Sequence, residues 1–447
     1  MKKTILTVLL ATAVMAAQAQ LRLTLDEALD IALSENPTIK IADMEVARYD
    51  YVTGETRANL LPQLSVDGSY TRSVVKQEIA KGLSFGADNT LTATANLSLP
   101  LIAPTVWRTL KLNRTQLAAA VESARSSRIN LAAEVKKAFY NVLLAEQSLA
   151  VLRASEADVQ RTVDDTRMKY DNGLASEYDL LTAEVQLSNL QPTILQTENS
   201  IKVAKLMLKM YLSLPEEVEF DVKGSLDEWS AVVADAVTLS TDISQNSDLR
   251  TLDLQEELLK RQLKVANASR MPTIGAFATA SYSGNDLDRS GFGGFGGMGD
   301  GSEAGTAAAI SKNSFYWQHP VSVGVQISVP IFSGLGKSKQ ARSIKNQIAQ
   351  IGLQKEYARK QVDVQVRSAI NDLLTARETM RSQERTVEQA AKAYSISDTR
   401  FRAGAGTILE LNSAQLAETQ ARLNYSQAIY DYLSAQADYE KILGHER

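Results

Sequence analysis

The chain has 447 residues, of which 44% are hydrophobic and 22% are charged, the proportions of an ordinary folded protein. These proportions exclude an intrinsically disordered chain and a membrane protein built of many apolar helices. Lysine and arginine number 48 against 52 aspartate and glutamate residues, so the chain lacks the electrostatic footprint of a nucleic-acid-binding protein. We therefore expect no nucleic-acid partner.

The composition also limits the chemistry that the chain can perform. Cysteine is absent and only two histidines are present, His319 and His445. Disulfides, thiolate metal sites, histidine clusters and cysteine nucleophiles are therefore excluded. Of the functions considered, we rank an outer-membrane hydrolase last, because the chain lacks a plausible Ser/His pair. We expect no enzymatic activity, no cofactor and no metal.

Residues 1–19 have the pattern of an export signal. Two lysines precede an apolar run from Ile5 to Val14, and Ala17-Gln18-Ala19 is a small-x-small cleavage site. No cysteine follows the cleavage site to carry a lipid anchor, and no later segment offers the ~18 apolar residues of a spanning helix. Any membrane span must then be made of strands.

The sequence contains one module twice. Segments of the first half recur 210 residues later, Asn36 as Asn246 and Ala58–Leu64 as Ala268–Ile274. Further along, Val135–Ala145 recurs as Val366–Ala376, at an offset of 231. The parts expected from this duplication are a first structural repeat over 20–212, a connecting segment over 213–247 and a second repeat over 248–447.

A Gly-rich segment accounts for the change of offset. Pro272 and Pro330 are 58 residues apart where Pro62 and Pro100 are 38 apart, so the second copy has 20 extra residues. Nine of the 23 glycines lie between residues 284 and 305. Such a composition cannot form a core, so we expect an exposed loop over 284–306.

Long helices are predicted from heptad spacing. Apolar residues step by four and three from Leu117 to Leu152, and the second copy repeats this register from Val362 to Met380. A helix over 104–170 would be about 100 Å long at 1.5 Å per residue. The other predicted helices are 38–61, 176–212, one opening the second repeat, 335–402 and 407–443. Two short helices stacked end to end can then pair antiparallel with each long one.

Strands are predicted where the period changes to two. Leu91–Leu99 and Val321–Val329 alternate apolar residues with small polar ones, as tilted outer-membrane strands do. Less regular strands follow Pro62 and Pro272, which gives strand hairpins over 63–100 and 273–330. The aromatic residues expected at the membrane interfaces are Trp107, Phe315, Tyr316 and Trp317. A soluble sandwich would also show alternation, but four strands cannot cover helices of this length.

The number of strands predicts the oligomeric state. Four strands cannot close into a barrel, and unpaired strand edges are not tolerated in lipid. Two chains would give a barrel filled by side chains, whereas three chains would leave a lumen. We therefore predict a homotrimer.

The duplication and several local motifs resemble the TolC-like outer-membrane efflux proteins. The motifs are Asn36-Pro37, Leu61-Pro62, Val329-Pro330-Ile331-Phe332 and the two turn sequences Tyr170–Glu184 and Arg400–Gln415. The resemblance implies a mixed α and β membrane protein of a Gram-negative outer membrane. Its parts would be a trimeric twelve-stranded β-barrel in outer-membrane lipid and a periplasmic α-barrel of long antiparallel coiled-coil helices. Such ducts work with a periplasmic adaptor (membrane fusion) protein and an inner-membrane pump of the RND or ABC type.

The resemblance also implies roles for particular residues. The adaptor-facing hairpin tips would be Gly173, Leu174, Ala175, Ser176, Gly404, Ala405, Gly406 and Thr407. The pore aperture and its gate would involve Asp179, Glu410, Tyr170 and Phe401. The chain departs from the family pattern because Phe401 lacks a tyrosine hydroxyl, Gly406 replaces an arginine and Ser413 replaces an acid. The alternative is that Asp179 and Glu410 are ordinary solvated charges on a helix surface.

Two functional classes remain at this point. The first is an exit duct, either of a tripartite efflux pump for small molecules or of a type I protein secretion system. The second is a trimeric coiled-coil stalk or adhesin at the cell surface, which would not need two hairpins with matched glycine tips. No methionine or histidine cluster indicates a metal substrate.

Overall fold

The fold is described from a computed structural model, for residues 21–75, 77–80, 83–85, 87–233, 239–287 and 316–446. The expected signal segment and Phe315 lie outside the described residues. Two compact units are present: one lies within Met1–Ala47, Ala118–Gln255 and Ile351–Arg447, the other within Arg48–Leu117 and Glu256–Gln350. No helix of this described part is both long enough and apolar enough to cross a membrane.

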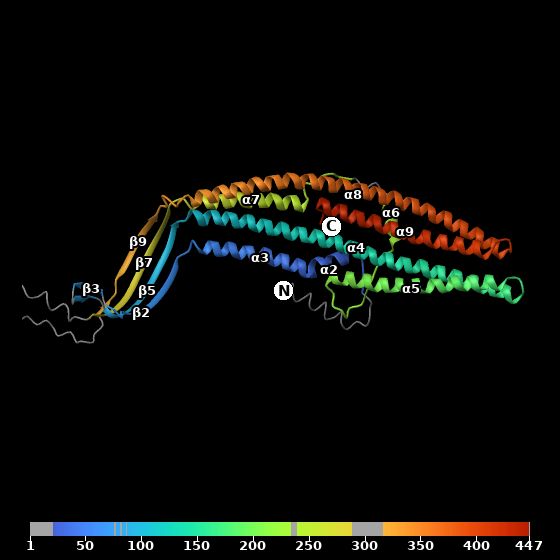
Figure 1. Ribbon diagram of the computed structural model, residues 1–447, viewed down its shortest axis with the longest axis horizontal. Coiled ribbons are helices and arrows are strands. Elements are labelled where there is room, and N and C mark those ends of the chain that lie inside the picture. Colours follow the sequence, from blue (N-terminus) through green and yellow to red (C-terminus); the bar gives the residue numbers. More distant parts are fainter. Residues whose placement is uncertain are drawn as a thin grey trace, which may run out of the picture. The chain divides into compact units, whose positions relative to one another are not determined.

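Each repeat contains one short, one long and one intermediate helix. They are α3 (Pro37–Ala58), α4 (Pro104–Asp171) and α5 (Glu177–Leu212), then α7 (Ser247–Ala268), α8 (Gly336–Arg402) and α9 (Ile408–Leu443). Their lengths are 22, 68 and 36 residues in the first repeat and 22, 67 and 36 in the second. The predicted internal duplication is therefore confirmed. Figure 1 shows α5 turning back beside the end of α4, and α9 beside α8.

The strands of the two repeats form one sheet. Its members are β2 (Gln63–Arg72), β5 (Ala87–Ile102), β7 (Thr273–Leu287), β8 (Tyr316–Gln318) and β9 (Val321–Ser328). The order is β2-β5-β7, and β8 and β9 both pair with the far side of β7. They continue one register there, Ser283 with Gln318 and Ala280 with Val321, so together they form one strand position. Pro320, which has no N–H to donate, lies at the interruption.

The sheet therefore has the four strand positions expected from the sequence. The pairing of β5 with β7 joins the two repeats. A further hairpin that the sequence did not predict, β3 (Gln77–Ala80) with β4 (Leu83–Phe85), follows β2.

The register of the sheet separates an apolar face from a polar one. One row across the strands is Leu64, Leu97, Ala278 and Val323, and the adjacent row is Ser65, Asn96, Thr279 and Ser322. Because successive side chains point to opposite faces, the period-two pattern places all the apolar rows together. The apolar face is uncovered within its unit, since Leu64 and Val323 are 70% and 78% exposed.

One predicted boundary is wrong. The Gly-rich loop was expected to begin at Gly284, but β7 continues to Leu287. Gly284 pairs with Leu91 on one side and Trp317 on the other. A Cβ there would lie 2.7 Å from the Trp317 ring, so the glycine makes room for the tryptophan. The rest of the expected loop, from residue 288 to 306, lies outside the described residues.

The core of the first unit lies among the helices and the connecting segment. Its most buried large side chains include Phe139 of α4, Leu208 of α5 and Tyr432 of α9, each at most 1% exposed. α2 (Leu25–Glu35) packs on this core, as does α6 (Leu226–Val233) through Leu226. Within the connecting segment, β6 (Phe220–Val222) pairs in parallel with β1 (Leu21–Leu23).

Candidate functional site

The two helical hairpins turn through matched tips. Gly173 and Gly404 have φ values of 72° and 74°, a left-handed conformation that glycine adopts without a steric penalty. In both tips the residue after the glycine donates its N–H to the fifth residue before it. These bonds are Leu174 to Lys169 O (2.7 Å) and Ala405 to Arg400 O (2.8 Å). The same local chemistry therefore ends α4 and α8.

The two predicted aperture acids begin the returning helices. Asp179 accepts hydrogen bonds from Ser176 N (3.1 Å) and Ser176 Oγ (2.6 Å), and its own N–H donates to Ser176 Oγ (3.2 Å). Glu410 and Thr407 repeat this reciprocal capping box, with Glu410 N donating to Thr407 Oγ1 at 3.2 Å. Both carboxylates therefore have a structural role at a helix N-terminus, where negative charge is favourable. The spacings Ser-x-x-Asp and Thr-x-x-Glu are the sequence signal for this role.

Glu410 also has a cation nearby. Arg400 Nη2 lies 3.8 Å from Glu410 Oε2, and the two side chains are 56% and 52% exposed. Arg400 Nη2 also donates to the carbonyl of Ala405 at 3.2 Å. An ion pair this long and this exposed contributes little to stability, so Arg400 is free to change partners at small cost.

Within the chain, a lysine at the first tip contacts a phenylalanine at the second tip. Lys169 Nζ, near the end of α4, donates to the carbonyl of Phe401 at 3.0 Å and lies 4.2 Å from the centre of the Phe401 ring. A cation over an aromatic face is an attractive contact. We call this pair the intrachain clasp. Phe401 therefore binds a cation, a role for which the hydroxyl of tyrosine is not required.

A small apolar cluster lies beneath the intrachain clasp. Its buried members are Val163, Ala183, Ile408 and Leu411, with Leu187, Tyr394 and Phe401 packed against them. Burial raises the pKa of the Tyr394 hydroxyl, and the neighbouring Asp398 adds to the shift. The clasp thus rests on residues from α4, α5, α8 and α9. Tyr170, the other predicted aperture aromatic, is 41% exposed and is outside this cluster.

Two buried asparagines join helices at the ends of the hairpins that lie away from the tips. Asn36 Oδ1 accepts from Thr38 N at the start of α3, and its Nδ2 donates to Tyr211 O in the last turn of α5, both at 2.8 Å. Asn246 repeats this arrangement between the start of α7 and Ile442 O in α9, also at 2.8 Å. Each amide thus satisfies unpaired groups of two helix ends. The sequence showed the repeat of these asparagines but not their role.

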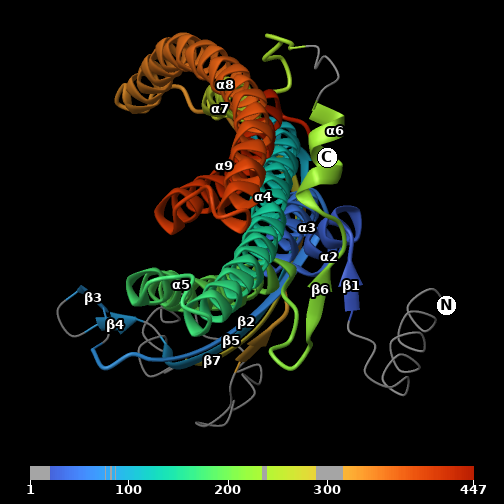
Figure 2. The ribbon, with the colours of Figure 1, turned by 90° about the vertical axis from the view of Figure 1, so that its right-hand side faces the viewer.

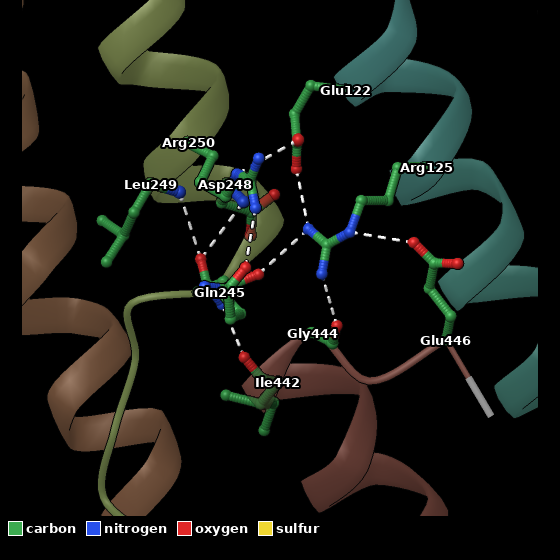
Figure 3. A network of polar contacts seen from close by, with 10 residues as sticks. Glu122, Arg125, Gln245, Asp248, Leu249, Arg250, Ile442, Gly444 and Glu446 are labelled. Atoms are coloured by element: carbon green, nitrogen blue, oxygen red, sulfur yellow. Dashed lines mark hydrogen bonds and ion pairs between the residues drawn. The ribbon is translucent and has the colours of Figure 1, made fainter.

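The second junction is braced by a charged network, drawn in Figure 3. Arg125 of α4 donates to Glu122 (2.9 Å), to the carbonyls of Gln245 (3.1 Å) and Gly444 (2.5 Å), and to Glu446 (3.0 Å). Glu122 is only 4% exposed and also pairs with Arg250 at 3.1 Å. A buried carboxylate is unfavourable without partners, and the two guanidinium groups compensate its charge here. Heptad spacing gave no sign of this network.

The predicted interfacial aromatics lie in different surroundings. Trp317 pairs with Gly284 in an apolar row of the sheet and stacks on Tyr282, with 4.8 Å between ring centres. Tyr316 pairs with Asn285, which places it in a polar row of the other face. Trp107 is in the first turn of α4 and is 45% exposed. Their contact with a membrane interface stays a prediction.

No metal centre is seen in the described part of the chain, where no three His, Cys, Asp or Glu side chains are grouped to hold an ion.

The geometry is that of a channel component. It combines a sheet with one apolar and one polar face and two long hairpins with matched tips. Comparison with known sequences agrees, since residues 28–213 and 239–445 match the family described as outer membrane efflux protein. The chain belongs to this family of outer-membrane channel proteins.

Particular relatives share most of the chain. It is similar to the outer membrane protein TolC of Escherichia coli K12, at 24% identity over 87% of this chain and 76% of TolC. It is also similar to the alkaline protease secretion protein AprF of Pseudomonas aeruginosa, at 22% identity over 91% of this chain and 81% of AprF. The crystal structure of VceC from Vibrio cholerae has the same fold, with a TM-score of 0.70 at 16% identity, covering 94% and 96% of the two chains.

Proposed function

We propose that the chain is the exit duct of a tripartite efflux pump, formed by three copies. The observation that carries the proposal is the sheet, which has one apolar and one polar face and ends in β2 and β9. In the described residues, β2 pairs only with β5 and β9 only with β7. Three such sheets joined edge to edge would make a twelve-strand barrel with the apolar rows in lipid and the polar rows around a wet lumen.

The helical hairpins would form the periplasmic part of the duct. Their tips, from Gly173 to Ser176 and from Gly404 to Thr407, would meet a periplasmic adaptor that connects the duct to an energised inner-membrane pump. Leu174 is 78% exposed at the first tip, which suits a protein contact. Membership of a channel family favours this duct over a surface stalk.

A second candidate is the exit duct of a type I protein secretion system. The similarity to AprF, a protein named for protease secretion, favours it. Deleting the gene and testing the strain against drugs, detergents, bile salts and metals distinguishes the two. Efflux predicts increased sensitivity with unchanged secreted protein, whereas secretion predicts loss of a secreted protein. A stable monomer in native mass spectrometry would refute both ducts.

Glu410 supplies a test of the aperture. Three copies would place three carboxylates around a narrow wet pore and favour cations over anions. Glu410→Gln removes the charge but keeps an oxygen for the capping box, so it isolates the electrostatic role. We expect lower cation selectivity in planar bilayers.

A matched control is Glu356→Gln, which removes one exposed charge from α8 and should leave selectivity unchanged. Equal selectivity in wild type and Glu410→Gln would remove the acid ring from the proposal. The same comparison with Asp179→Asn tests the second acid.

A further inference from the structure

The intrachain clasp has a counterpart at the repeat-related positions. Lys169 and Phe401 are 231 residues from Arg400 and Tyr170 respectively, the offset that relates the two tips. The cation and the aromatic ring therefore occur at the end of both long helices. Lys169 of α4 contacts Phe401 of α8 within the chain. By repeat symmetry, Arg400 of α8 should contact a Tyr170 at the end of an α4.

Arg400 and Tyr170 of one chain do not make this contact with each other in the single copy. Tyr170 is 41% exposed, and the side chain of Arg400 is 56% exposed. The contacts described for Arg400 are to its own tip, to Ala405 and, loosely, to Glu410. Figure 2 shows the curved row of helices in this part of the molecule, with α4 between the α5 and α9 branches. In a closed ring of copies, the next α4 beyond α8 belongs to a neighbour.

We propose that Arg400 of one copy binds the ring of Tyr170 in the neighbouring copy. The inference rests on the proposed trimeric duct. The tips would then form a closed ring in which Lys169–Phe401 clasps within chains alternate with Arg400–Tyr170 clasps between chains. Arginine and tyrosine are both well suited to this contact, since guanidinium groups pair with aromatic faces more often than ammonium groups do.

A second pair of residues follows the same rule. Thr419 Oγ1 of α9 lies 2.9 Å from Ser155 Oγ of α4, and both side chains are buried. Their repeat-related positions are Ser188 and Thr386, which also have hydroxyl groups but are exposed in the single copy. A hydroxyl group is thus kept at both positions, where each donates to a carbonyl of its own helix. In the proposed trimer the two hydroxyl groups would form a buried pair between neighbouring copies, as Ser155 and Thr419 do within the chain.

The clasps between copies differ from the intrachain clasp in what lies beneath them. Ile408 and Leu187 belong to the apolar cluster under the intrachain clasp. Their repeat-related residues are Glu177 and Glu418. Carboxylates are costly to bury where apolar side chains are favourable. The clasps between copies are therefore the weaker set, and we expect them to separate before the intrachain clasps do.

Cross-linking tests the contact directly. The chain has no cysteine, so introduced pairs are the only thiols. With a bifunctional maleimide that spans the two long side chains, Tyr170→Cys with Arg400→Cys should give covalent dimers and trimers on a denaturing gel. The control pair, Lys169→Cys with Phe401→Cys, should cross-link within the chain and give no covalent oligomers.

The result that overturns the clasp is a trimer by native mass spectrometry in which the 170/400 pair forms no covalent oligomers and the 169/401 pair cross-links. Absence of any trimer would instead overturn the proposed function. The two failures are thus distinguishable.

Permeability tests the predicted weakness. Passive uptake of a large antibiotic such as vancomycin should rise about two- to fivefold in Tyr170→Leu, the range of one exposed cation–π contact. Tyr170→Phe keeps the ring and should stay close to wild type, and Lys169→Ala should have a smaller effect than Tyr170→Leu. Equal effects of Tyr170→Phe and Tyr170→Leu, or a larger effect of Lys169→Ala, would contradict the inference.

Discussion

Asn36 gives a prediction that separates two roles of one side chain. Its carbonyl oxygen caps α3 and its amide group holds the carbonyl of Tyr211 in α5. Asn36→Asp keeps the capping oxygen but loses the donor, and the buried carbonyl loses its partner at a cost of about 1–3 kcal/mol. Asn36→Ala also loses the cap, which adds about 1 kcal/mol. The side chain is 6% exposed, so water does not readily replace the lost bond.

Hydrogen exchange measures the two effects separately. Because each 1.4 kcal/mol corresponds to about a factor of ten, exchange in the last turn of α5 should rise about five- to hundredfold in Asn36→Asp. The first turn of α3 should change only in Asn36→Ala. The matched control is Asn246→Asp, which loses the bond to Ile442 O but keeps the Arg125 brace on Gly444 and should have the smaller effect. Unchanged exchange at the end of α5 in Asn36→Asp would refute the reasoning.

Three further predictions follow from the same unit. Glu122→Ala leaves two guanidinium groups without their buried carboxylate and should cost about 3 kcal/mol, measured as faster exchange at the start of α7. Gly444→Ala should perturb the junction, because a Cβ at residue 444 would overlap the carbonyl of Gln245. Gly173 has a similar positive φ but open space around it, so Gly173→Ala should lower the free energy of unfolding by only about 1–2 kcal/mol. Rates of proteolysis compare the two variants. Hydrogen bonds from the backbone and then the side chain of Thr24 lower the pKa of Glu27. The stabilisation of α2 by Glu27 is therefore complete above the ordinary glutamate pKa and is lost as pH falls through the lowered value. Hydrogen exchange at the α2 N-terminus, corrected for intrinsic rates, should show this pH dependence, and Glu27→Gln should abolish the dependence.

Periodicity predicted the larger part of the fold. The alternation in Leu91–Leu99 and Val321–Val329 corresponds to the register that β5, β7 and β9 adopt. The absence of proline after residue 330 agrees with uninterrupted helices α8 and α9. Such patterns are informative because burial of one face repeats along a whole element.

Contacts between distant elements were not predictable in the same way. Gly284 looked like the start of a loop because its need for glycine comes from Trp317, which is distant in sequence. Glu122 occupies an ordinary helical position, and only Arg250 of another helix makes its burial possible. The capping boxes of Asp179 and Glu410 differ in this respect, since the spacings Ser-x-x-Asp and Thr-x-x-Glu predict them from neighbouring residues alone. Local signals report neighbours in sequence, whereas the roles of Gly284 and Glu122 depend on neighbours in space.

The parallel pairing of β1 with β6 has a consequence for how the chain folds. It joins Leu21–Leu23 to Phe220–Val222, so its first strand must wait for a partner from beyond the whole first repeat. Bringing β1 to β6 closes a loop of the whole first repeat, which lowers the entropy of the chain before any contact stabilises the pairing. Such topologies fold slowly. The hairpin of α4 and α5 joins two elements that are adjacent in sequence, so it can begin to form at its tip before β6 is present. A newly exported chain should therefore hold its beginning unpaired until the connecting segment arrives, and fragments ending before residue 220 should leave this first strand open to proteases.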